Sequence, residues 1–211
     1  DLLVQPMFED VGVFQRLGGS TDVVRKEMYD FEDKGGRRIA LRPEGTAQAA
    51  RAYLEHHPTP PWKAWYTGPK FRYDRPQKGR YRQHHEVGVE AIGTADADID
   101  VEVISLACGF YAALGLTGLT LRLTSLGDGT CRPAYRAELE AYLTERRDQL
   151  CPEHVDRINE NPLRVLDCKR EQCVAATKDA PHMVDRLCDD CAAHFTRVRA
   201  GLDAAAVDYT L

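Results

Sequence analysis

Long hydrophobic runs are missing from this sequence. No stretch approaches the roughly 18 consecutive apolar residues that a membrane-spanning helix requires. The first residues also lack the basic start and the small-residue cleavage site of a secretory signal peptide. We therefore expect a cytoplasmic protein without a membrane partner. The sequence contains neither an internal repeat nor a low-complexity segment, which argues against a repeat fold.

Disulfide bonds are also not expected. The chain has seven cysteines, an odd number, and at 211 residues it is long enough to be stable without covalent cross-links. Reduced thiols or metal ligands are the better interpretation. The net charge of −5 argues against a surface that binds nucleic acid indiscriminately, but it does not exclude a local basic patch.

One segment departs from this acidic balance. Between positions 70 and 82, Asp74 is the one acid among several basic side chains, which are Lys70, Arg72, Arg75, Lys78, Arg80 and Arg82. A local concentration of positive charge in an acidic protein suits a polyanion such as ATP or the end of an RNA.

Hydrophobic periodicity predicts strands mixed with a few helices in the first two-thirds of the chain. Alternating or extended patterns predict strands at 2–6, 27–32, 38–41, 63–74, 83–93 and 119–123. Helical spacing predicts helices at 43–56, 99–114 and 134–150. In the helix at 99–114 the predicted buried face holds Ile99, Val103, Leu106, Phe110 and Leu114. Strands that meet through hairpins indicate an α+β fold, with an antiparallel sheet flanked by helices.

The composition changes after Asp128. We expect a catalytic core over 1–128, an inserted helical subdomain over 129–206, and the start of a returning core strand over 207–211. Both ends of the sequence fall inside expected strands, so we expect the chain to be an incomplete piece of a longer protein.

The strands at 63–74 and 83–93 place charged residues on one face. Alternate residues of a strand share a face. We therefore expect one face of the first strand to hold Gly68, Lys70, Arg72 and Asp74, and the other to hold Phe71 and Tyr73. On the return strand Glu86, Gly88 and Glu90 share a face, while Val87 and Val89 pack on the opposite one. Two carboxylates beside a glycine would leave room for a ligand, with a guanidinium on the partner strand. The alternative is a solvated hairpin of mixed charges.

Specific motifs resemble a known family. Residues 71–83, FRYDRPQKGRYRQ, resemble motif 2 of the class II aminoacyl-tRNA synthetases in its histidyl version, and 41–46, LRPEGT, resemble the amino-acid-binding segment of the histidyl-tRNA synthetase family. Residues 21–29 and 161–167 are similar to sequences of the same family, and Pro6 would be the proline of motif 1. The resemblance spans nearly the whole chain.

The resemblance implies an activity and its partners. Members of the family activate histidine with ATP and Mg²⁺ and transfer it to tRNA(His), and they act as homodimers. Motif 3 and the anticodon-binding domain are not present in this sequence. We therefore expect that the fragment alone does not aminoacylate tRNA.

The resemblance also implies roles for the residues around ATP and tRNA. Arg72 would be the catalytic residue, binding the α-phosphate of ATP and the histidine carboxylate. Arg80 would contact the outer phosphates. Asp74, where the family usually has glutamate, would lie near the adenine amino group. Arg75 and Gln77 would meet the acceptor end of the tRNA.

Histidine recognition is assigned in the same way. Glu44 and Thr46 would hold the α-amino group, together with Arg72 on the carboxylate. Glu90 would accept a hydrogen bond from the imidazole. Glu86 stands at a position often held by glutamine, so its negative charge departs from the family pattern.

The cysteines of the insertion suggest a zinc site. Four thiolates from two short pairs suit tetrahedral zinc, and the pairs here are Cys168 with Cys173 and Cys188 with Cys191. Cys151 and His154 offer two further ligands. The alternative is that these cysteines are small buried apolar residues of a helical subdomain.

Two other functions remain open at this point. The first is the regulatory paralogue of the family in histidine biosynthesis, which keeps the fold without aminoacylating tRNA. The second is a zinc-dependent nucleic-acid-binding module centred on the cysteines. The second leaves the charged face of the strand pair unexplained.

Overall fold

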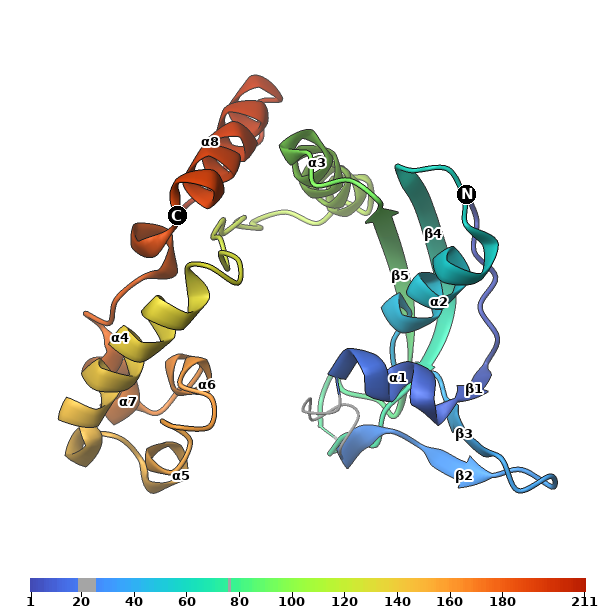
Figure 1. Cartoon of the computed structure of the whole chain (residues 1–211), viewed down its shortest axis with the longest axis horizontal. Helices are drawn as coiled ribbons and strands as arrows, with labels where there is room; N and C mark the ends of the chain where they lie inside the picture. The colour runs from blue at the N-terminus through green and yellow to red at the C-terminus, as the bar shows by residue number, and fades with distance from the viewer. Residues whose placement is uncertain (19–25, 76) are drawn as a thin grey trace. The chain divides into compact units, whose positions relative to one another are not determined.

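The chain divides into two compact units, Asp1–Ala95 and Asp96–Leu211. The computed structural model describes residues 1–18, 26–75 and 77–211 (Figure 1). Part of the family-like segment 21–29, and position 76 of the motif 2-like loop, lie outside these described residues. Each unit has its own packing and is described by itself.

The first unit is built on a long antiparallel strand pair, β4 (Trp62–Phe71) and β5 (Gln83–Ile92) (Figure 1). A second, three-stranded antiparallel sheet has the order β1-β3-β2. Its strands and the two helices of this unit are β1 (Phe8–Asp10), β2 (Asp30–Glu32), β3 (Arg38–Leu41), α1 (Val11–Gly18) and α2 (Thr46–His56). A small core of Val11, Phe14, Ala40 and Ala47 joins α1, β3 and α2. This core fixes the start of α2, which carries residues of the site described below.

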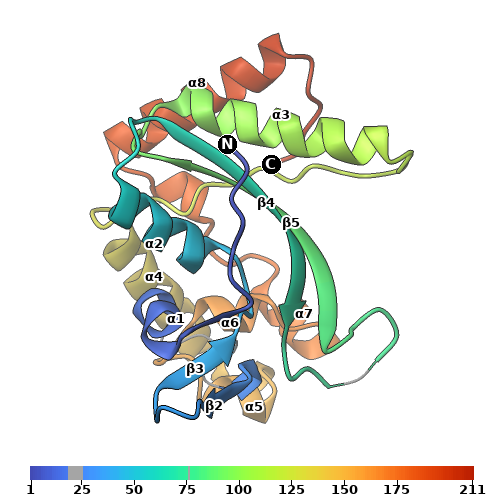
Figure 2. The same cartoon turned by 90° about the vertical axis from the view of Figure 1, so that its right-hand side faces the viewer.

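The second unit is helical. α3 (Ala97–Ala113) and α8 (Asp189–Ala204) lie side by side (Figure 2). Ala97 of α3 packs there with Leu123 and with Val198 and Leu202 of α8. The other helices are α4 (Arg132–Glu145), α5 (Pro152–Val155), α6 (Leu163–Leu166), α7 (Glu171–Thr177) and the 3-10 helices η2 (Arg147–Gln149) and η3 (Met183–Arg186).

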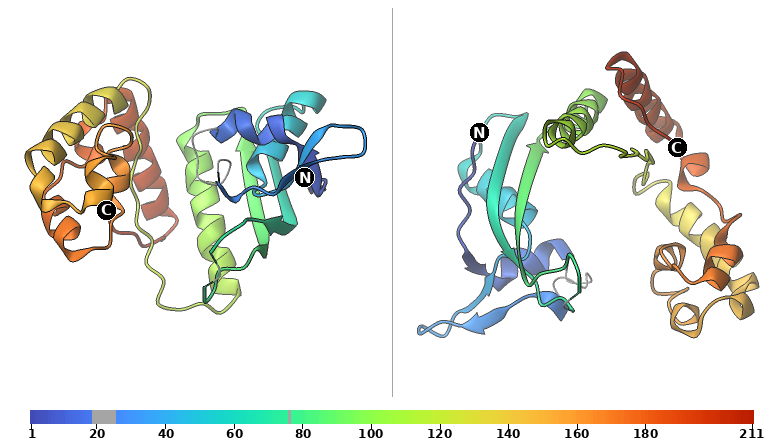
Figure 3. Two further views of the ribbon diagram at one scale, coloured as in Figure 1. Left: turned by 90° about the horizontal axis from the view of Figure 1, so that it is seen from below. Right: turned by 180° about the vertical axis from the view of Figure 1, so that it is seen from behind.

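A second core of this unit lies among α4 and the short helices, which are the yellow and orange ribbons gathered together in Figure 3. Tyr135, Leu139 and Leu143 recur every four residues along α4, so they form one buried stripe. Val165 of α6 and Cys173 of α7 are fully buried against the same core. The short helices are therefore stabilised by packing and by the chain segments that join them, since helices of four residues are not stable alone.

The predicted α+β class, with an antiparallel sheet and flanking helices, is confirmed. The strand pair, the hairpin of β2 and β3, and helices α2 and α3 occur where the sequence predicted them. β1 and α1 were not predicted. The strands predicted at 119–123 and 207–211 meet in an isolated parallel bridge between Arg122 and Thr210. The predicted domain boundary at 128 stays a prediction.

Two predictions about buried faces are wrong. Leu106, Phe110 and Leu114 were predicted to lie on the buried face of the helix at 99–114, but they are exposed. α3 packs instead through Ala97 and its neighbours. Val87 and Val89 of β5 are also exposed, by 54% and 38%. Periodicity could not identify the packed face of α3, because apolar residues occur on every side of this helix. Within the described ranges every helix is too short or too polar to span a bilayer.

Candidate active site and cysteine clusters

The register of the strand pair decides which side chains share a face. Gly68 lies opposite Glu86, Tyr66 opposite Gly88, and Ala64 opposite Glu90. Residues that oppose each other in an antiparallel pair project to the same side. Glu86 and Glu90 therefore point to the partly buried side of the hairpin, together with Tyr66.

The ring of Tyr66 fills the space beside Gly88. A Cβ added to Gly88 would lie 2.2 Å from Cζ of Tyr66, and one added to Gly45 would lie 2.3 Å from the same ring. The prediction that Gly88 leaves room for a ligand between Glu86 and Glu90 is therefore wrong. These glycines accommodate a buried aromatic ring, which the spacing of acids and glycine along β5 could not reveal.

Glu90 is held in place by two hydroxyl groups. Tyr66 Oη donates to Glu90 Oε1 at 3.2 Å, and Thr46 Oγ1 donates to the same oxygen at 2.8 Å. Burial and the carboxylate of Glu90 raise the pKa of Tyr66, so its hydroxyl keeps its proton. The predicted histidine-binding residues Thr46 and Glu90 are thus in direct contact.

Glu44 lies at the start of α2. Its carboxylate accepts hydrogen bonds from the backbone N–H groups of Thr46 at 2.6 Å and Ala47 at 3.1 Å. These are the unsatisfied donors of a helix N-terminus, so Glu44 caps the helix. Burial raises the pKa of Glu44, and the neighbouring charge of Glu86 raises it further, against the two N–H donors.

A buried lysine is the cation that faces Glu86. Lys70 is fully buried, its Nζ donates to Gln5 Oε1 at 2.6 Å, and the same nitrogen lies 3.8 Å from Glu86 Oε1. Burial lowers the pKa of Lys70, and Glu86 opposes that shift. Sequence analysis assigned this place to Arg72, counted Lys70 in the basic segment suited to a polyanion, and gave no role to Gln5; the burial of Lys70 shows that it does not belong to an exposed basic surface. The alternation of Lys70 with Arg72 along the strand was the signal that could have found it.

One oxygen of Glu86 has no hydrogen-bond donor within the described part of the chain. This buried atom is Oε1, and its contact with Lys70 is longer than a hydrogen bond. A buried acceptor without a donor is costly. A ligand that brings an N–H or an ammonium group would satisfy it.

Arg72 lies just beyond the end of β4. Its backbone N–H donates to the carbonyl of Arg82 at 2.9 Å, and its guanidinium Nε donates to the carbonyl of Pro43 at 2.8 Å. The alternation had predicted that Arg72 belongs to the strand. This prediction is wrong, because β4 ends at Phe71. Its guanidinium instead lies beside the segment that leads to Glu44.

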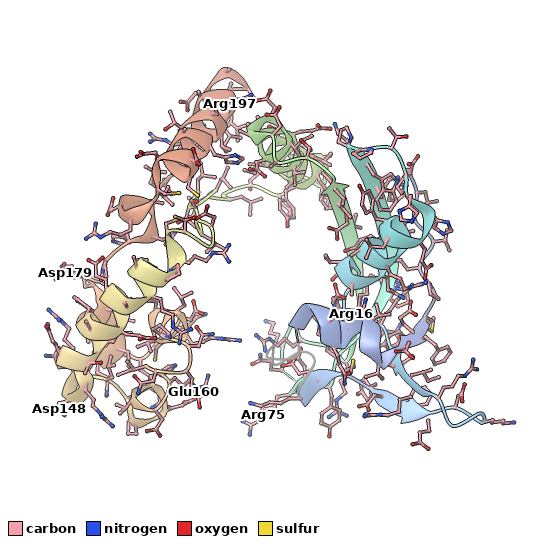
Figure 4. The ribbon with its side chains drawn as sticks, in the orientation of Figure 1. Arg16, Arg75, Asp148, Glu160, Asp179 and Arg197 are labelled. Atoms are coloured by element: carbon pink, nitrogen blue, oxygen red, sulfur yellow. The ribbon has the colours of Figure 1, made fainter. Side chains whose placement is uncertain are left out.

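The loop between β4 and β5 holds the remaining predicted residues. Arg80 and Asp74 form an ion pair at 3.5 Å, and the N–H of Arg80 donates to the carbonyl of Gln77 at 2.9 Å. Arg75 is exposed, and its side chain projects outward from the loop (Figure 4). Arg82 lies over the ring of Tyr73 at 4.0 Å. The loop thus presents basic groups while Asp74 is engaged by one of them.

The site residues therefore fall into two groups. Glu44, Thr46, Glu86 and Glu90 surround the start of α2 and the inner face of β5, and Arg72 reaches the same segment through Pro43. The other predicted residues, Asp74, Arg75, Gln77 and Arg80, belong to the exposed loop. Acids able to hold a cation thus lie near a guanidinium able to hold an anion.

The cysteines gather in two clusters in the second unit. Cluster A consists of Cys151, His154, Cys168 and Cys173. Cluster B consists of Asp128, Cys131, Cys188 and Cys191. Within each cluster the candidate ligand atoms all lie within 4.8 Å of one another.

The predicted zinc site of four cysteines is therefore wrong in its grouping. Cys168 and Cys173 belong to cluster A, whereas Cys188 and Cys191 belong to cluster B. Spacing along the chain could not separate them, because each pair finds its other ligands at distant positions. Asp128 and Cys131 were not among the predicted ligands, and Cys151 and His154 were noted as further ones.

Comparison with known proteins gives consistent similarities. Residues 1–129 match the family model described as histidyl-tRNA synthetase. The chain is 52% identical over 198 residues to the histidine–tRNA ligase of Dehalococcoides mccartyi, covering 92% of this chain and 47% of that protein. It is 52% identical over 207 residues to that of Anaeromyxobacter dehalogenans, covering 97% of this chain and 50% of that protein. The chain thus spans about half the length of these curated relatives.

Solved structures show the same similarity. The apo histidyl-tRNA synthetase of S. aureus superimposes with a TM-score of 0.73 at 34% identity, covering 100% of this chain and 47% of that one. A Bacillus halodurans protein described as an ATP phosphoribosyltransferase regulatory subunit/histidyl-tRNA synthetase gives a TM-score of 0.62 at 19% identity, covering 98% of this chain and 57% of that one. At that identity the second match shows a shared fold.

Proposed function

Because this chain belongs to the histidyl-tRNA synthetase family, we propose that it carries the part of the enzyme that binds histidine and ATP for the synthesis of histidyl-adenylate. The whole enzyme would then transfer histidine to tRNA(His). The cytoplasmic location and the homodimer implied by the resemblance belong to the same proposal.

The buried oxygen of Glu86, which has no donor among the described residues, is the observation that supports histidine binding most directly. Free histidine carries an α-ammonium group and a ring N–H, both of which can donate to carboxylates, and its second ring nitrogen also donates when the imidazole is protonated. Glu44, Glu86 and Glu90 provide three carboxylates around the start of α2. We assign the α-amino group to Glu44 and Thr46 and the imidazole to Glu90, with Glu86 as the additional acceptor.

Selectivity for histidine would follow from these acceptors. Glu90 is oriented by Thr46 and Tyr66, so its position does not depend on the ligand. An amino acid without a ring N–H would leave this partly buried carboxylate without the additional donor that the ligand brings. Sites that hydrogen-bond a substrate group reject analogues that lack the group much more strongly than apolar pockets do.

Arg72 would provide the charge that adenylate formation requires. In this reaction the histidine carboxylate attacks the α-phosphorus of ATP and pyrophosphate leaves. Both reactants are anions, so a cation must bring them together and hold them in line. A guanidinium remains charged and can bind two oxygens in one plane. The bond from Arg72 Nε to Pro43 O fixes the side chain beside the histidine-binding segment.

The exposed loop would bind the outer phosphates and the tRNA. Arg80 is proposed to contact the outer phosphates, which requires its ion pair with Asp74 to open or to be shared. Asp74 would then lie near the adenine. Mg²⁺ would arrive as part of the ATP complex and neutralise phosphate charge. Arg75 and Gln77 would meet the acceptor end of tRNA(His).

Histidine-dependent exchange of pyrophosphate into ATP tests this proposal. The assay is carried out on a full-length protein that contains this chain, with each of the other common amino acids as a control. Exchange with histidine, followed by charging of tRNA(His), is the expected result. Histidine binding without exchange or charging would contradict the proposed enzymatic activity. It would favour the regulatory paralogue as the identity of the protein.

A further inference from the structure

Clusters A and B have the dimensions of metal sites. In tetrahedral zinc coordination with Zn–S bonds of about 2.3 Å, neighbouring sulfurs lie roughly 3.8 Å apart. In cluster B the sulfurs of Cys131 and Cys191 lie 3.9 Å apart. The ligand atoms of cluster A lie within the same 4.8 Å limit as those of cluster B. We propose that clusters A and B are two separate tetrahedral zinc sites.

Cluster A has the ligand set of a structural zinc site, three cysteines and one histidine. Cys151 precedes the first residue of α5, and His154 lies within that helix, so their side chains meet, with Cys151 Sγ 2.8 Å from His154 Nδ1. Cys173 comes from α7, and Cys168 lies between α6 and α7. The N–H of Cys151 also donates to Cys173 Sγ at 3.2 Å. N–H donors to sulfur stabilise the thiolate form that binds a metal.

Cluster B joins the starts of two longer helices. Cys131 and Cys188 are the residues immediately before α4 and α8. Asp128 Oδ1 lies 3.2 Å from Cys131 Sγ, and the N–H of Asp128 donates to the same sulfur at 3.3 Å. Three thiolates and a carboxylate would leave a bound Zn²⁺ with excess negative charge. The positive ends of two helix dipoles offset part of this charge.

The backbone beside cluster B is also shaped around the sulfur. Gly127 has φ of +60°, and a Cβ at this position would lie 2.5 Å from Cys131 Sγ. A side chain would therefore displace the sulfur as well as strain the backbone. Glycine at 127 permits the close approach that the cluster requires.

Disulfides do not account for the clusters. Each cluster contains three cysteines, so pairing any two leaves the third thiol, together with the histidine or the aspartate, without a function. A disulfide also requires sulfurs about 2.05 Å apart, well below the separation of Cys131 and Cys191. Thiolate and imidazole together favour zinc over the hard cations magnesium and calcium.

The two sites would have separate structural effects. Site A would fasten the segments around α5, α6 and α7, which are short helices. Site B would connect the start of α4 with the start of α8, positions that are far apart along the sequence. Metal binding to such segments contributes directly to the stability of the folded state.

Zinc content of the full chain tests the proposal. The protein is purified under reducing conditions with zinc in the medium, and metal is measured by mass spectrometry against the protein concentration. We expect two zinc ions per chain, and one each in Cys168→Ser and Cys191→Ser. These two cysteines are only partly buried. Cys108→Ser, outside both clusters, is the matched control and should keep two.

A second measurement distinguishes ligation from folding defects. In the unmutated protein the six clustered thiols should react slowly with a thiol reagent until a strong chelator is added, while Cys108 reacts independently of the chelator. Cobalt in place of zinc should give the visible bands of tetrahedral coordination. If the unmutated protein held one zinc ion per chain and each single variant held none, the cysteines would form one shared site, and the proposal would be wrong. No stoichiometric zinc, or disulfides in the protein as purified, would also overturn the proposal.

Discussion

At the scale of single residues, Arg72 combines two properties in one side chain. Its Nε is fixed by the carbonyl of Pro43, and the planar guanidinium can still contact more than one oxygen. Lysine at this position would keep the charge but lose both the fixed geometry and the two-pronged contact.

We therefore predict that Arg72→Lys in a full-length protein lowers histidine-dependent pyrophosphate exchange by roughly 10²–10³-fold, as for the loss of a preorganised donor to a transition state. Arg37→Lys is the control, because Arg37 lies in the β2–β3 hairpin and pairs with Asp33. Exchange rates close to those of the unmutated protein would remove Arg72 from the proposed mechanism.

The carboxyl of Glu44 makes stability depend on pH. Burial and the charge of Glu86 raise its pKa above the ordinary value of 4.5. A carboxyl whose pKa is higher in the folded state favours folding when it is protonated. Its contribution is therefore fully present below pH 4.5 and is lost as the pH rises through the folded-state pKa.

The difference in unfolding free energy between the unmutated protein and Glu44→Gln should consequently change in favour of the variant as pH rises above 4.5. Urea titrations of both proteins at a series of pH values measure this difference. Glu55→Gln, a substitution on the exposed end of α2, controls for the general effect of removing a carboxylate. A difference that is constant with pH would refute the assignment.

At the scale of secondary-structure elements, the packing between α2 and the β4–β5 pair depends on glycine. The ring of Tyr66 contacts Gly45 before α2 and Gly88 on β5, with no space for a Cβ at either position. We predict that Gly88→Ala costs about 1–3 kcal/mol of stability, the range found for overpacked cores. Thermal and denaturant unfolding measure the loss.

The control for this prediction is Gly109→Ala in α3. A Cβ at Gly109 would meet no atom within 4 Å, so this substitution should be neutral or stabilising, because alanine favours a helix over glycine by roughly 1 kcal/mol. A combined change of Gly88→Ala with Tyr66→Leu should cost less than the sum of the single changes. Additive effects would contradict the steric explanation.

The start of α3 is stabilised by a cap and by α8. Asp96 accepts a hydrogen bond from the N–H of Asp98, and Arg197 of α8, labelled in Figure 4, pairs with both acids at 3.1 Å. Asp96→Ala should lower stability by about 1 kcal/mol, the usual cost of losing an N-cap. Asp148→Ala, at an exposed position of η2, is the matched control and should change little.

The sequence predicted the long strands well, but it missed the shortest elements and the end of β4. Alternating residues identified β4 and β5 because one side of this hairpin is buried and the other exposed. β1 and α1 were missed because three strand residues and eight helix residues are too short for a clear period. β4 ends at Phe71, and the side chain of Arg72 bonds to the carbonyl of Pro43, a contact that no local pattern specifies.

At the scale of the whole molecule, the proposed substrate site and the proposed zinc sites belong to different compact units. The residues assigned to histidine and ATP belong to Asp1–Ala95, and clusters A and B belong to Asp96–Leu211. If the zinc proposal holds, metal removal should loosen the second unit without changing the first.

Hydrogen exchange with and without a strong chelator measures this effect. We expect faster exchange in peptides from 128–191 and unchanged exchange in peptides from β4 and β5. Equal changes in both units would contradict two independently stabilised units. Unchanged exchange throughout would contradict the structural role of the metal.

The candidate site could be predicted only in part from the sequence. The family resemblance supplied Glu44, Arg72 and Glu90 as candidates, because it carries information that periodicity lacks. The contact between Lys70 and Gln5 was missed because the two residues are 65 positions apart in the sequence, and clusters A and B were merged because their ligands are also distant along the chain. Long-range packing, which decides these contacts, leaves little trace in the local order of residues.

The burial of Lys70 has a practical consequence. Its ammonium group has no access to solvent and is engaged by Gln5 and Glu86, so acylating reagents that modify surface amines cannot reach it while the hairpin is closed. Exposed lysines such as Lys78 carry no such protection. The modification rate of Lys70 relative to Lys78 therefore provides a chemical record of how often the hairpin opens.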